Sequence, residues 1–497
     1  MNAPVRSPFS HGGMRPPAER DYSYKWTAFI AIGISFVTQV LAQSMVFVAL
    51  SDIADDFGVT LRAVSWVVVI QALTISAFMM PMGRLADIIG WRKVHLIGLV
   101  VFGGGAMCVA LAPTFGLLIA ARVLMAAGNS MGQSVGTAMA VAVFPPEERG
   151  TAIGSQTTAV AIGGASGPMV GGLVLQVLPW EALFWMVQIP IAIAFISGYF
   201  LLTEERLGQP RDAERPPFDY LGATISVIAI SIFVVVVNNP LAMSWTSPLL
   251  LGGFAAVAVL FAGFVPWELR HRAPMVELRM FADRVFSMAS LARFLGFLGA
   301  TVTILMAPIY LISLRGMDTA AAGAVLFLGF VGMGVAAQAT GRLSDRFGPR
   351  RFALGGYVIM MTTALSFSFL TSATPLWLVA PLLLVNGVGM GTWNVPNNTM
   401  IIGAVPVSRL GVVGALTNLT RNVGNVVGQA VAAGVVVAVM AGQGFDIPLS
   451  EVRETAGASA AFFDGWQAAY WMAAFFMGIA LLCTVFAPGG RRGSRER

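Results

Sequence analysis

The chain has 497 residues, of which 57% are hydrophobic and 11% are charged, and its mean hydropathy is +0.78. A soluble domain needs about a quarter charged residues to cover its surface, so these values exclude an ordinary water-soluble protein and indicate an all-α membrane protein. The net charge of +6 would suggest a nucleic-acid partner in a soluble chain. In a membrane protein basic residues set the orientation instead, so we expect the lipid bilayer as a partner and no nucleic acid.

The chain begins with a polar, proline-rich stretch, residues 1–26. This stretch lacks the apolar core and the cleavage site of a signal peptide. We therefore expect it to be a cytoplasmic tail, and we expect the same of residues 488–497. Cys108 and Cys483 both fall inside apolar runs, so no disulfide framework is indicated.

Fourteen apolar stretches of about the 20 residues that a membrane-spanning helix needs lie between these tails. We expect spans at 27–50, 61–82, 94–112, 116–143, 151–176, 183–203, 220–240, 248–267, 287–312, 319–340, 352–371, 375–402, 411–440 and 465–487. With the N-terminus inside, the outer loops hold only Arg62, Arg315 and Arg453 of the 30 Lys and Arg. Because cytoplasmic loops are rich in Lys and Arg, this asymmetry supports fourteen spans with both termini cytoplasmic. We expect the membrane to be a plasma membrane, the inner membrane of a bacterium.

One short motif occurs twice, as GRLADIIGWRKV at 83–94 after the second span and as GRLSDRFGPRRF at 341–352 after the tenth. Duplication of a six-helix unit would place the copies six spans apart, but eight separate them. We therefore expect an N-terminal six-helix bundle (27–205), two inserted helices with their linkers (206–285) and a C-terminal six-helix bundle (286–487). Internal repeats of this kind are typical of transporters, with the substrate between the repeats. A basic turn that only anchors one membrane face is the alternative for either copy alone.

These residues resemble the major facilitator superfamily, and specifically its fourteen-helix drug:proton antiporter family. The resemblance implies the major facilitator fold, with two pseudo-symmetric six-helix bundles plus two additional central helices. It also implies that the two motif loops are gates whose aspartates hold the cytoplasmic side shut. The gating residues would be Gly83, Asp87, Gly90 and Arg92 in the first copy and Gly341, Asp345, Arg346 and Gly348 in the second. We call the contacts by which Asp87 and Asp345 would hold the cytoplasmic side shut the two latches. Ile88 and Trp91 stand where basic residues are usual, so we expect the two latches to be unequal in strength.

The fifth span carries GSQTTAVAIGGASGPMVGG at 154–172, which is similar to the exporter motif of this family. The matching residues are Gly154, Gly163, Gly167, Pro168, Gly171 and Gly172. Glycines four residues apart make one bare helix face on which another backbone packs closely, and a proline removes one helical hydrogen bond. Tight packing alone would explain the pattern, whereas the resemblance favours a hinge that controls which side of the membrane opens.

The first span departs from the family, because it reads LAQSMVFVALS with Ala42 at the usual aspartate position. No acidic residue falls in the middle third of any expected span. Intramembrane carboxylates are the usual proton relays and the usual partners of cationic drugs. Proton coupling therefore stays open, with Arg122 and Glu181 as the possible coupling residues.

Arginine and amide side chains replace the missing acid. We expect Arg293, near the start of its span, to extend to the headgroups, while Arg122 and Arg421 either bind backbone carbonyls or face a cavity. Amides recur at helical spacing in four spans, which predicts a wet substrate cavity between the halves. The alternative is a set of interhelical hydrogen bonds worth about 0.6 kcal/mol each. The residues expected to line the cavity are Gln39, Gln43, Arg122, Asn129, Gln133, Asn394, Asn397, Asn418, Arg421, Asn422 and Asn425.

The leading hypothesis is a monomeric secondary transporter that exports neutral or anionic amphipathic small molecules by alternating access, without a cofactor. Proton-coupled efflux of hydrophobic cations is the alternative. An enzyme is disfavoured, since the three histidines lie in the tail and at helix ends, where they suggest no metal site, and no phosphate-binding glycine loop is present. A receptor or scaffold would bind a ligand without transporting it.

Overall fold

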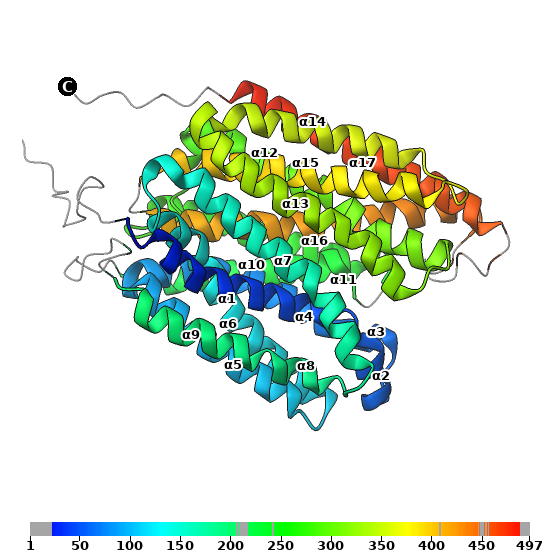
Figure 1. Cartoon of the computed structure of the whole chain (residues 1–497), viewed down its shortest axis with the longest axis horizontal. Helices are drawn as coiled ribbons and strands as arrows, with labels where there is room; N and C mark the ends of the chain where they lie inside the picture. The colour runs from blue at the N-terminus through cyan, green and yellow to red at the C-terminus, as the bar shows by residue number, and fades with distance from the viewer. Residues whose placement is uncertain are drawn as a thin grey trace, which may run out of the picture.

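The structure, a computed structural model, describes residues 22–487 except 205–206, 208–216, 241–242, 407–408, 446, 448–451, 453–454 and 456. It is a bundle of long helices that run in roughly the same direction (Figure 1). Most of the expected tail 1–26 and the whole of 488–497 lie outside the described residues.

The first half of the chain forms a group of helices in chain order. They are α1 (Lys25–Met45), α2 (Leu50–Phe57), α3 (Leu61–Val64), α4 (Trp66–Ile89), α5 (Trp91–Ala110), α6 (Phe115–Ala142), η2 (Pro146–Glu148), α7 (Arg149–Leu175), α8 (Glu181–Met186) and α9 (Gln188–Leu201). The expected span 27–50 is too long by a turn, because α1 ends at Met45 and the short helix α2 follows. Asp52 in the first turn of α2 suits the positive end of a helix, and Gly58 closes α2 in the left-handed conformation.

The second half begins with a pair of helices and continues with a second group. The pair is α10 (Tyr220–Asn238) and α11 (Pro248–Arg270). The group is η3 (Leu278–Ala282), α12 (Arg284–Pro308), the π-helix η4 (Ile309–Leu314), α13 (Thr319–Phe347), α14 (Pro349–Ser368), α15 (Leu376–Gly403), α16 (Leu410–Gly442) and α17 (Ala458–Phe486).

Thirteen helical segments of the described chain are long and apolar enough to cross a membrane. The remaining expected span, 352–371, corresponds to α14, which has 20 residues and packs against α15 and α17. Its first turn contains Arg350 and Arg351, which lower its hydropathy. The fold class is therefore confirmed, with α14 less apolar than the other long helices.

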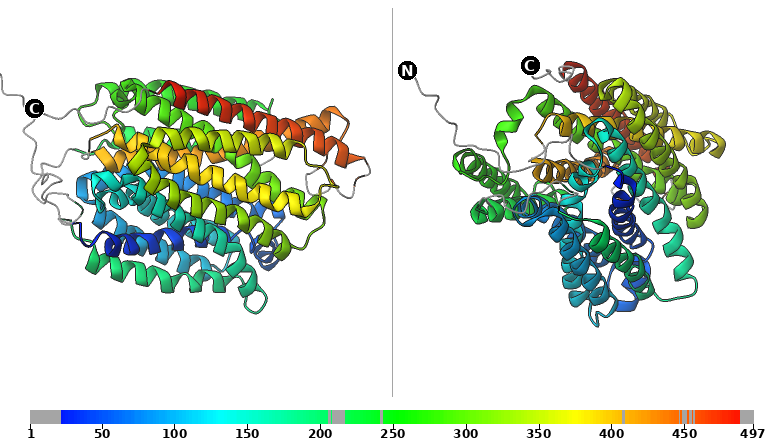
Figure 2. Two further views of the ribbon diagram at one scale, coloured as in Figure 1. Left: turned by 45° about the horizontal axis from the view of Figure 1, so that its top comes forward. Right: turned by 60° about the vertical axis from the view of Figure 1, so that its left-hand side comes forward.

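The two groups repeat the same arrangement. In the first, α1 packs on α7 and α9, and α4 and α5 pack on α6. In the second, α12 packs on α16 and α17, and α13 and α14 pack on α15. The groups lie side by side (Figure 2) and meet at two junctions, α4 against α16 and α7 against α13. The two junctions correspond to each other, because α4 and α7 occupy the same places in the first group as α13 and α16 occupy in the second.

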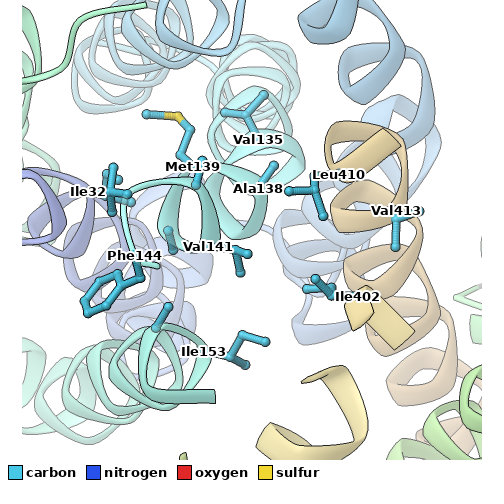
Figure 3. Close-up of a cluster of buried hydrophobic side chains, with 14 of the residues drawn as sticks. Ile32, Val135, Ala138, Met139, Val141, Phe144, Ile153, Ile402, Leu410 and Val413 are labelled. Atoms are coloured by element: carbon cyan, nitrogen blue, oxygen red, sulfur yellow. The ribbon is translucent and has the colours of Figure 1, made fainter. Parts of the chain in front are cut away.

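The two groups share one apolar core at the end of the molecule that carries both motif copies, which we call the motif end. Figure 3 shows this core, to which the first group contributes Ile32, Phe144 and Ile153 and the second contributes Ile402 and Leu410. Away from the motif end each group has a core of its own, one around Leu99 and Phe184 and the other around Phe367 and Trp466. The halves are thus joined at the motif end.

The helix pair inserted between the halves covers only one junction. α10 packs on α4 and α16, and α11 packs on α10. After α11 the chain returns across the same junction, where Met275 and Val276 pack in an apolar cluster with Met80 and Val412. The insert therefore fastens to both halves along the α4–α16 junction.

Candidate functional site

Asp345, at the motif end of α13, binds the first turn of α7 in the other half. One carboxylate oxygen, Oδ1, accepts from the Gly150 backbone N–H at 2.7 Å. The other, Oδ2, accepts from the Thr151 backbone N–H at 2.8 Å and from the Thr151 hydroxyl at 2.7 Å. The first N–H groups of a helix have no partner within the helix and carry partial positive charge. A carboxylate therefore suits this position.

Two glycines allow the helices of this latch to touch. A Cβ atom placed on Gly150 would lie 2.5 Å from the carbonyl oxygen of Gly341, and one on Gly341 would lie 2.5 Å from that of Gly150. Cβ atoms do not approach backbone oxygens so closely, so only glycine allows this approach of α7 and α13.

Replacing Gly150 by valine should push α7 and α13 apart and disfavour the closed motif end by about 1–3 kcal/mol, the usual cost of overpacking. The measurement is the distance between spin labels at Lys93→Cys and Phe347→Cys, exposed positions at the motif ends of the two halves. The control is Gly355→Val in α14, where a Cβ atom would meet nothing within 4 Å. Unchanged distances in Gly150→Val would contradict this account of the glycine pair.

Asp87 makes the equivalent latch between α4 and α16, with fewer bonds. Its Oδ2 accepts from the Val412 backbone N–H at 3.2 Å, and its Oδ1 accepts from the Trp91 indole at 2.8 Å. Gly83 lies directly against Ala415 of α16. Trp91 thus donates a hydrogen bond within its own half, and only one of these bonds crosses between the halves. The geometry of the two latches is unequal.

The other motif residues serve their own half. Gly90 and Gly348 have φ of 107° and 87°, which suits glycine at the turns after α4 and α13. Arg92 donates from Nη2 to the Tyr199 carbonyl at 2.7 Å, and the Arg346 guanidinium lies 5.7 Å from the centre of the Phe347 ring.

A polar cluster connects α6 with α16 about a third of the way in from the motif end, and we call it the polar layer. Arg421 donates from Nη2 to Gln133 Oε1 at 2.8 Å, and Gln133 donates from Nε2 to Asn129 Oδ1 at 2.9 Å. Asn418 donates from Nδ2 to the Gln133 carbonyl at 2.9 Å and to the Thr137 hydroxyl at 3.2 Å. The Nδ2 of Asn129 is buried without a partner. Four of the sequence-predicted cavity residues therefore meet here, across the two halves.

Arg293 belongs to the same layer, and the expectation that it extends to the headgroups is wrong. It is 3% exposed, and it donates from Nε to the Thr417 carbonyl at 3.0 Å and from Nη1 to Asn394 Oδ1 at 2.9 Å. The helix α12 begins at Arg284, with Asp283 as its N-cap, which puts Arg293 about 13 Å inside. The capping aspartate was the sequence signal for this earlier start.

Arg122 lies apart from the polar layer. It is 1% exposed, and it donates to the Val67 carbonyl and to Gln71 Oε1, with its guanidinium 5.9 Å from the centre of the Phe184 ring. All of these partners belong to the first half. Eleven residues separate Arg122 from Gln133 on α6, which is about 16 Å along a helix.

None of these three arginines has an acidic partner: among the described residues, no carboxylate lies within 4.0 Å of a guanidinium nitrogen of Arg122, Arg293 or Arg421. Thr417, which accepts from Arg293, lies one helical turn from Arg421. Two positive charges therefore lie close together in the polar layer, bonded only to neutral acceptors.

The remaining predicted cavity residues occupy other contacts. Asn397 donates from Nδ2 to the Ala289 carbonyl at 3.1 Å, and the Thr301 hydroxyl donates to Asn425 Oδ1 at 2.8 Å, both within the second half. Gln39 is buried against Gly132. Gln43 and Asn422 are half-buried, and Glu181 begins α8, far from the motif end.

The glycines of α7 pack against both halves, and three of them contact α1 of their own half. Gly163 and Gly167 lie against Val37 and Ser44 of α1, and Gly171 lies against Met45. Gly154 faces the other half, as Gly150 and Gly164 do, because a Cβ atom there would meet the carbonyl oxygen of Ala337 in α13. Pro168 lies inside the helix and Gly172 faces open space. The hinge role of this segment stays a prediction.

Comparison with known proteins matches residues 32–429 to the family model described as Major Facilitator Superfamily. A riboflavin transporter of Clostridioides difficile (strain 630) is 26% identical over 463 residues, which cover 93% of this chain and 97% of that protein. The tetracenomycin C resistance and export protein of Streptomyces glaucescens is 26% identical, covering 84% and 77%. The multidrug efflux pump LfrA of Mycolicibacterium smegmatis is 26% identical, covering 90% and 88%.

Two solved structures are similar in fold. The human organic anion transporter MFSD10 matches with a TM-score of 0.63 and 16% identity, over 93% of this chain and all of that one. The proton:xylose symporter XylE matches with a TM-score of 0.63 and 14% identity, over 94% of this chain and 96% of that one. At these identities the likeness shows the major facilitator fold and nothing further.

Proposed function

This chain belongs to the major facilitator superfamily, so it is a multi-pass membrane transporter and not an enzyme, and we propose that it exports amphipathic small molecules by alternating access. The names of two relatives, an antibiotic resistance and export protein and a multidrug efflux pump, support export. Both relatives are bacterial, which supports an inner-membrane location, with the motif end and both termini in the cytoplasm.

In this proposal residues 27–205 and 286–487 are the two moving bundles. The shared core and both latches close the motif end, which supports assigning this structure to the state that faces outward. An exporter must then open the motif end to take up substrate from the cytoplasm. That step breaks the bonds of Asp345 to Gly150 and Thr151, and it separates Arg421 from Gln133.

The observation that carries the substrate preference is the pair of arginines in the polar layer. Burying an arginine at mid-bilayer costs about 2.5–3.5 kcal/mol even on insertion scales, and the described residues offer no carboxylate to offset it. When the motif end opens, Arg421 loses its bond to Gln133. A neutral or anionic substrate group would replace that bond, whereas a cation would be repelled. Any proton coupling would involve Arg122 or Glu181.

The test is efflux from proteoliposomes of two probes with the same ring system and opposite charge, a naphthalenesulfonate and a naphthylmethyl trimethylammonium ion. We expect protein-dependent efflux of the sulfonate to be the faster, and protein-free liposomes are the control. Faster efflux of the ammonium ion would favour the alternative, proton-coupled export of hydrophobic cations. Binding of either probe without efflux would overturn the assignment as an exporter of such compounds.

A further inference from the structure

A polar cavity of about 200 Å³ lies at the motif end, beside the Asp87 latch. Three parts of the molecule enclose it, namely the end of α4, the start of α16 and the segment that follows α11. The lining residues that carry charge are Arg84, Asp87, Arg272, Glu277 and Arg409.

The charges around this cavity are unequal, with three arginines and two carboxylates. Glu277 is paired with Arg409 at 2.8 Å, and Asp87 accepts from the Val412 N–H and from the Trp91 indole. Within the described chain, no carboxylate is in ion-pair distance of Arg84 or Arg272. The Nε of Arg84 is buried without a hydrogen-bond partner. The cavity therefore contains two arginine charges that no carboxylate pairs with, and one hydrogen-bond donor that has no acceptor.

The start of α16 adds to this positive character. Its N-cap residue, Arg409, provides no side-chain cap, and Asp87 binds the N–H of Val412 in the first turn. The first turn of a helix carries partial positive charge and favours anions, phosphate groups above all. Arginine is also the side chain best suited to phosphate, because its planar donors match the geometry of the phosphate oxygens.

The segment that contributes Arg272 is held firmly over the junction. The buried carboxylate of Glu268, at the end of α11, accepts from the Val276 N–H at 3.0 Å, and the Met275 and Val276 side chains are buried. Among the described residues, no such segment covers the equivalent junction of α7 and α13. There the counterpart of Arg84 in the second motif copy is Arg342, which is exposed.

We propose that this cavity binds a phosphate group, carried by an acidic phospholipid or by a small phosphate ester, and that the bound phosphate favours the closed motif end. Arg84 comes from the first half, Arg409 from the second and Arg272 from the insert. Opening of the α4–α16 junction separates these groups, so the complete site exists only in the closed state. A ligand that binds one state preferentially shifts the population toward it.

The experiment uses the full chain in nanodiscs and measures the fraction with a closed motif end, by spin labels at Lys93→Cys and Phe347→Cys. Discs of phosphatidylcholine alone are compared with discs that also contain phosphatidylglycerol, and with phosphatidylcholine discs to which glycerol phosphate is added. We expect at least one phosphate source to raise the closed fraction. In Arg84→Gln and Arg272→Gln the concentration needed should rise at least about tenfold, since each loses a charge-assisted bond.

Arg342→Gln is the matched control, because it removes the same charge at the equivalent place in the other motif copy. An effect of phosphatidylglycerol alone identifies the lipid headgroup as the source, and an effect of glycerol phosphate identifies a soluble ester. The proposal is overturned if neither source changes the closed fraction, or if Arg342→Gln weakens the response as much as Arg272→Gln does.

Discussion

Replacing Arg421 by glutamine is expected to slow efflux of the naphthalenesulfonate by about 10- to 100-fold, since a charge-assisted bond is worth about 1.5–3 kcal/mol. Efflux of the ammonium probe should not fall, because the change removes a repulsive charge. The same direction is expected for Arg293→Gln, because Arg293 is buried and binds the carbonyl of Thr417, one helical turn from Arg421 on α16. The measurement is the ratio of the two efflux rates in proteoliposomes, which cancels differences in the amount of active protein.

Arg122→Gln is the control for this prediction. It removes the same charge, but Arg122 lies about 16 Å along α6 from Gln133 and binds only partners of the first half. It should therefore lower the thermal stability and leave the ratio of rates unchanged. If Arg122→Gln changes the ratio and Arg421→Gln does not, the counter-charge for the substrate is Arg122, and our assignment of the polar layer is wrong.

Replacing Asp345 by asparagine is expected to reduce the closed-to-open ratio of the motif end about a hundredfold. The carboxylate accepts three hydrogen bonds from the other half, and their charge-assisted part is worth about 3 kcal/mol. Asp87→Asn should reduce the ratio only about tenfold, because a single bond of Asp87 crosses between the halves. The label pair at Lys93→Cys and Phe347→Cys reports both changes, with Cys108→Ser in the background to remove the exposed native thiol.

The order of the two effects is what decides this prediction. Equal shifts, or a larger shift in Asp87→Asn, would show that the number of bonds across each junction does not set latch strength. The variant Asp318→Asn serves as a control, since Asp318 precedes α13 at the end of that helix away from the motif. It should leave the distances between the labels unchanged.

Much of the fold was predictable because its signals are local. Long apolar stretches predicted the membrane helices, and the repeated motif located the equivalent junctions, since both copies sit at turns that need glycine at Gly90 and Gly348. The break between α1 and α2 had no comparably strong signal, because the apolar run continues through residues 46–50. The unequal latches also followed from sequence, although the direct bond from Trp91 to Asp87 did not.

The candidate site was predictable only in part, because it depends on which helices face each other. Amide spacing selected Gln133 and Asn418, which are hydrogen-bonded to each other across the halves, although the cavity that they were expected to line stays a prediction. The same reasoning grouped Arg122 with Arg421. In the folded protein, however, the hydrogen-bond partners of Arg122 all belong to the first half. The sequence pattern placed Arg293 at a membrane surface because the true start of α12, at its capping aspartate, lies three residues earlier than the apolar run.

The inserted pair α10 and α11 also has a consequence for molecules dissolved in the bilayer. It covers the α4–α16 junction, whereas within the described residues α7 and α13 meet without such a cover. An amphipathic compound that diffuses in the plane of the membrane therefore meets a covered junction on one side of the protein and an uncovered junction on the other. Two apolar helices would block entry from the bilayer at the α4–α16 junction, whereas the α7–α13 junction would stay exposed to lipid. Such a compound would therefore enter the protein at the α7–α13 junction.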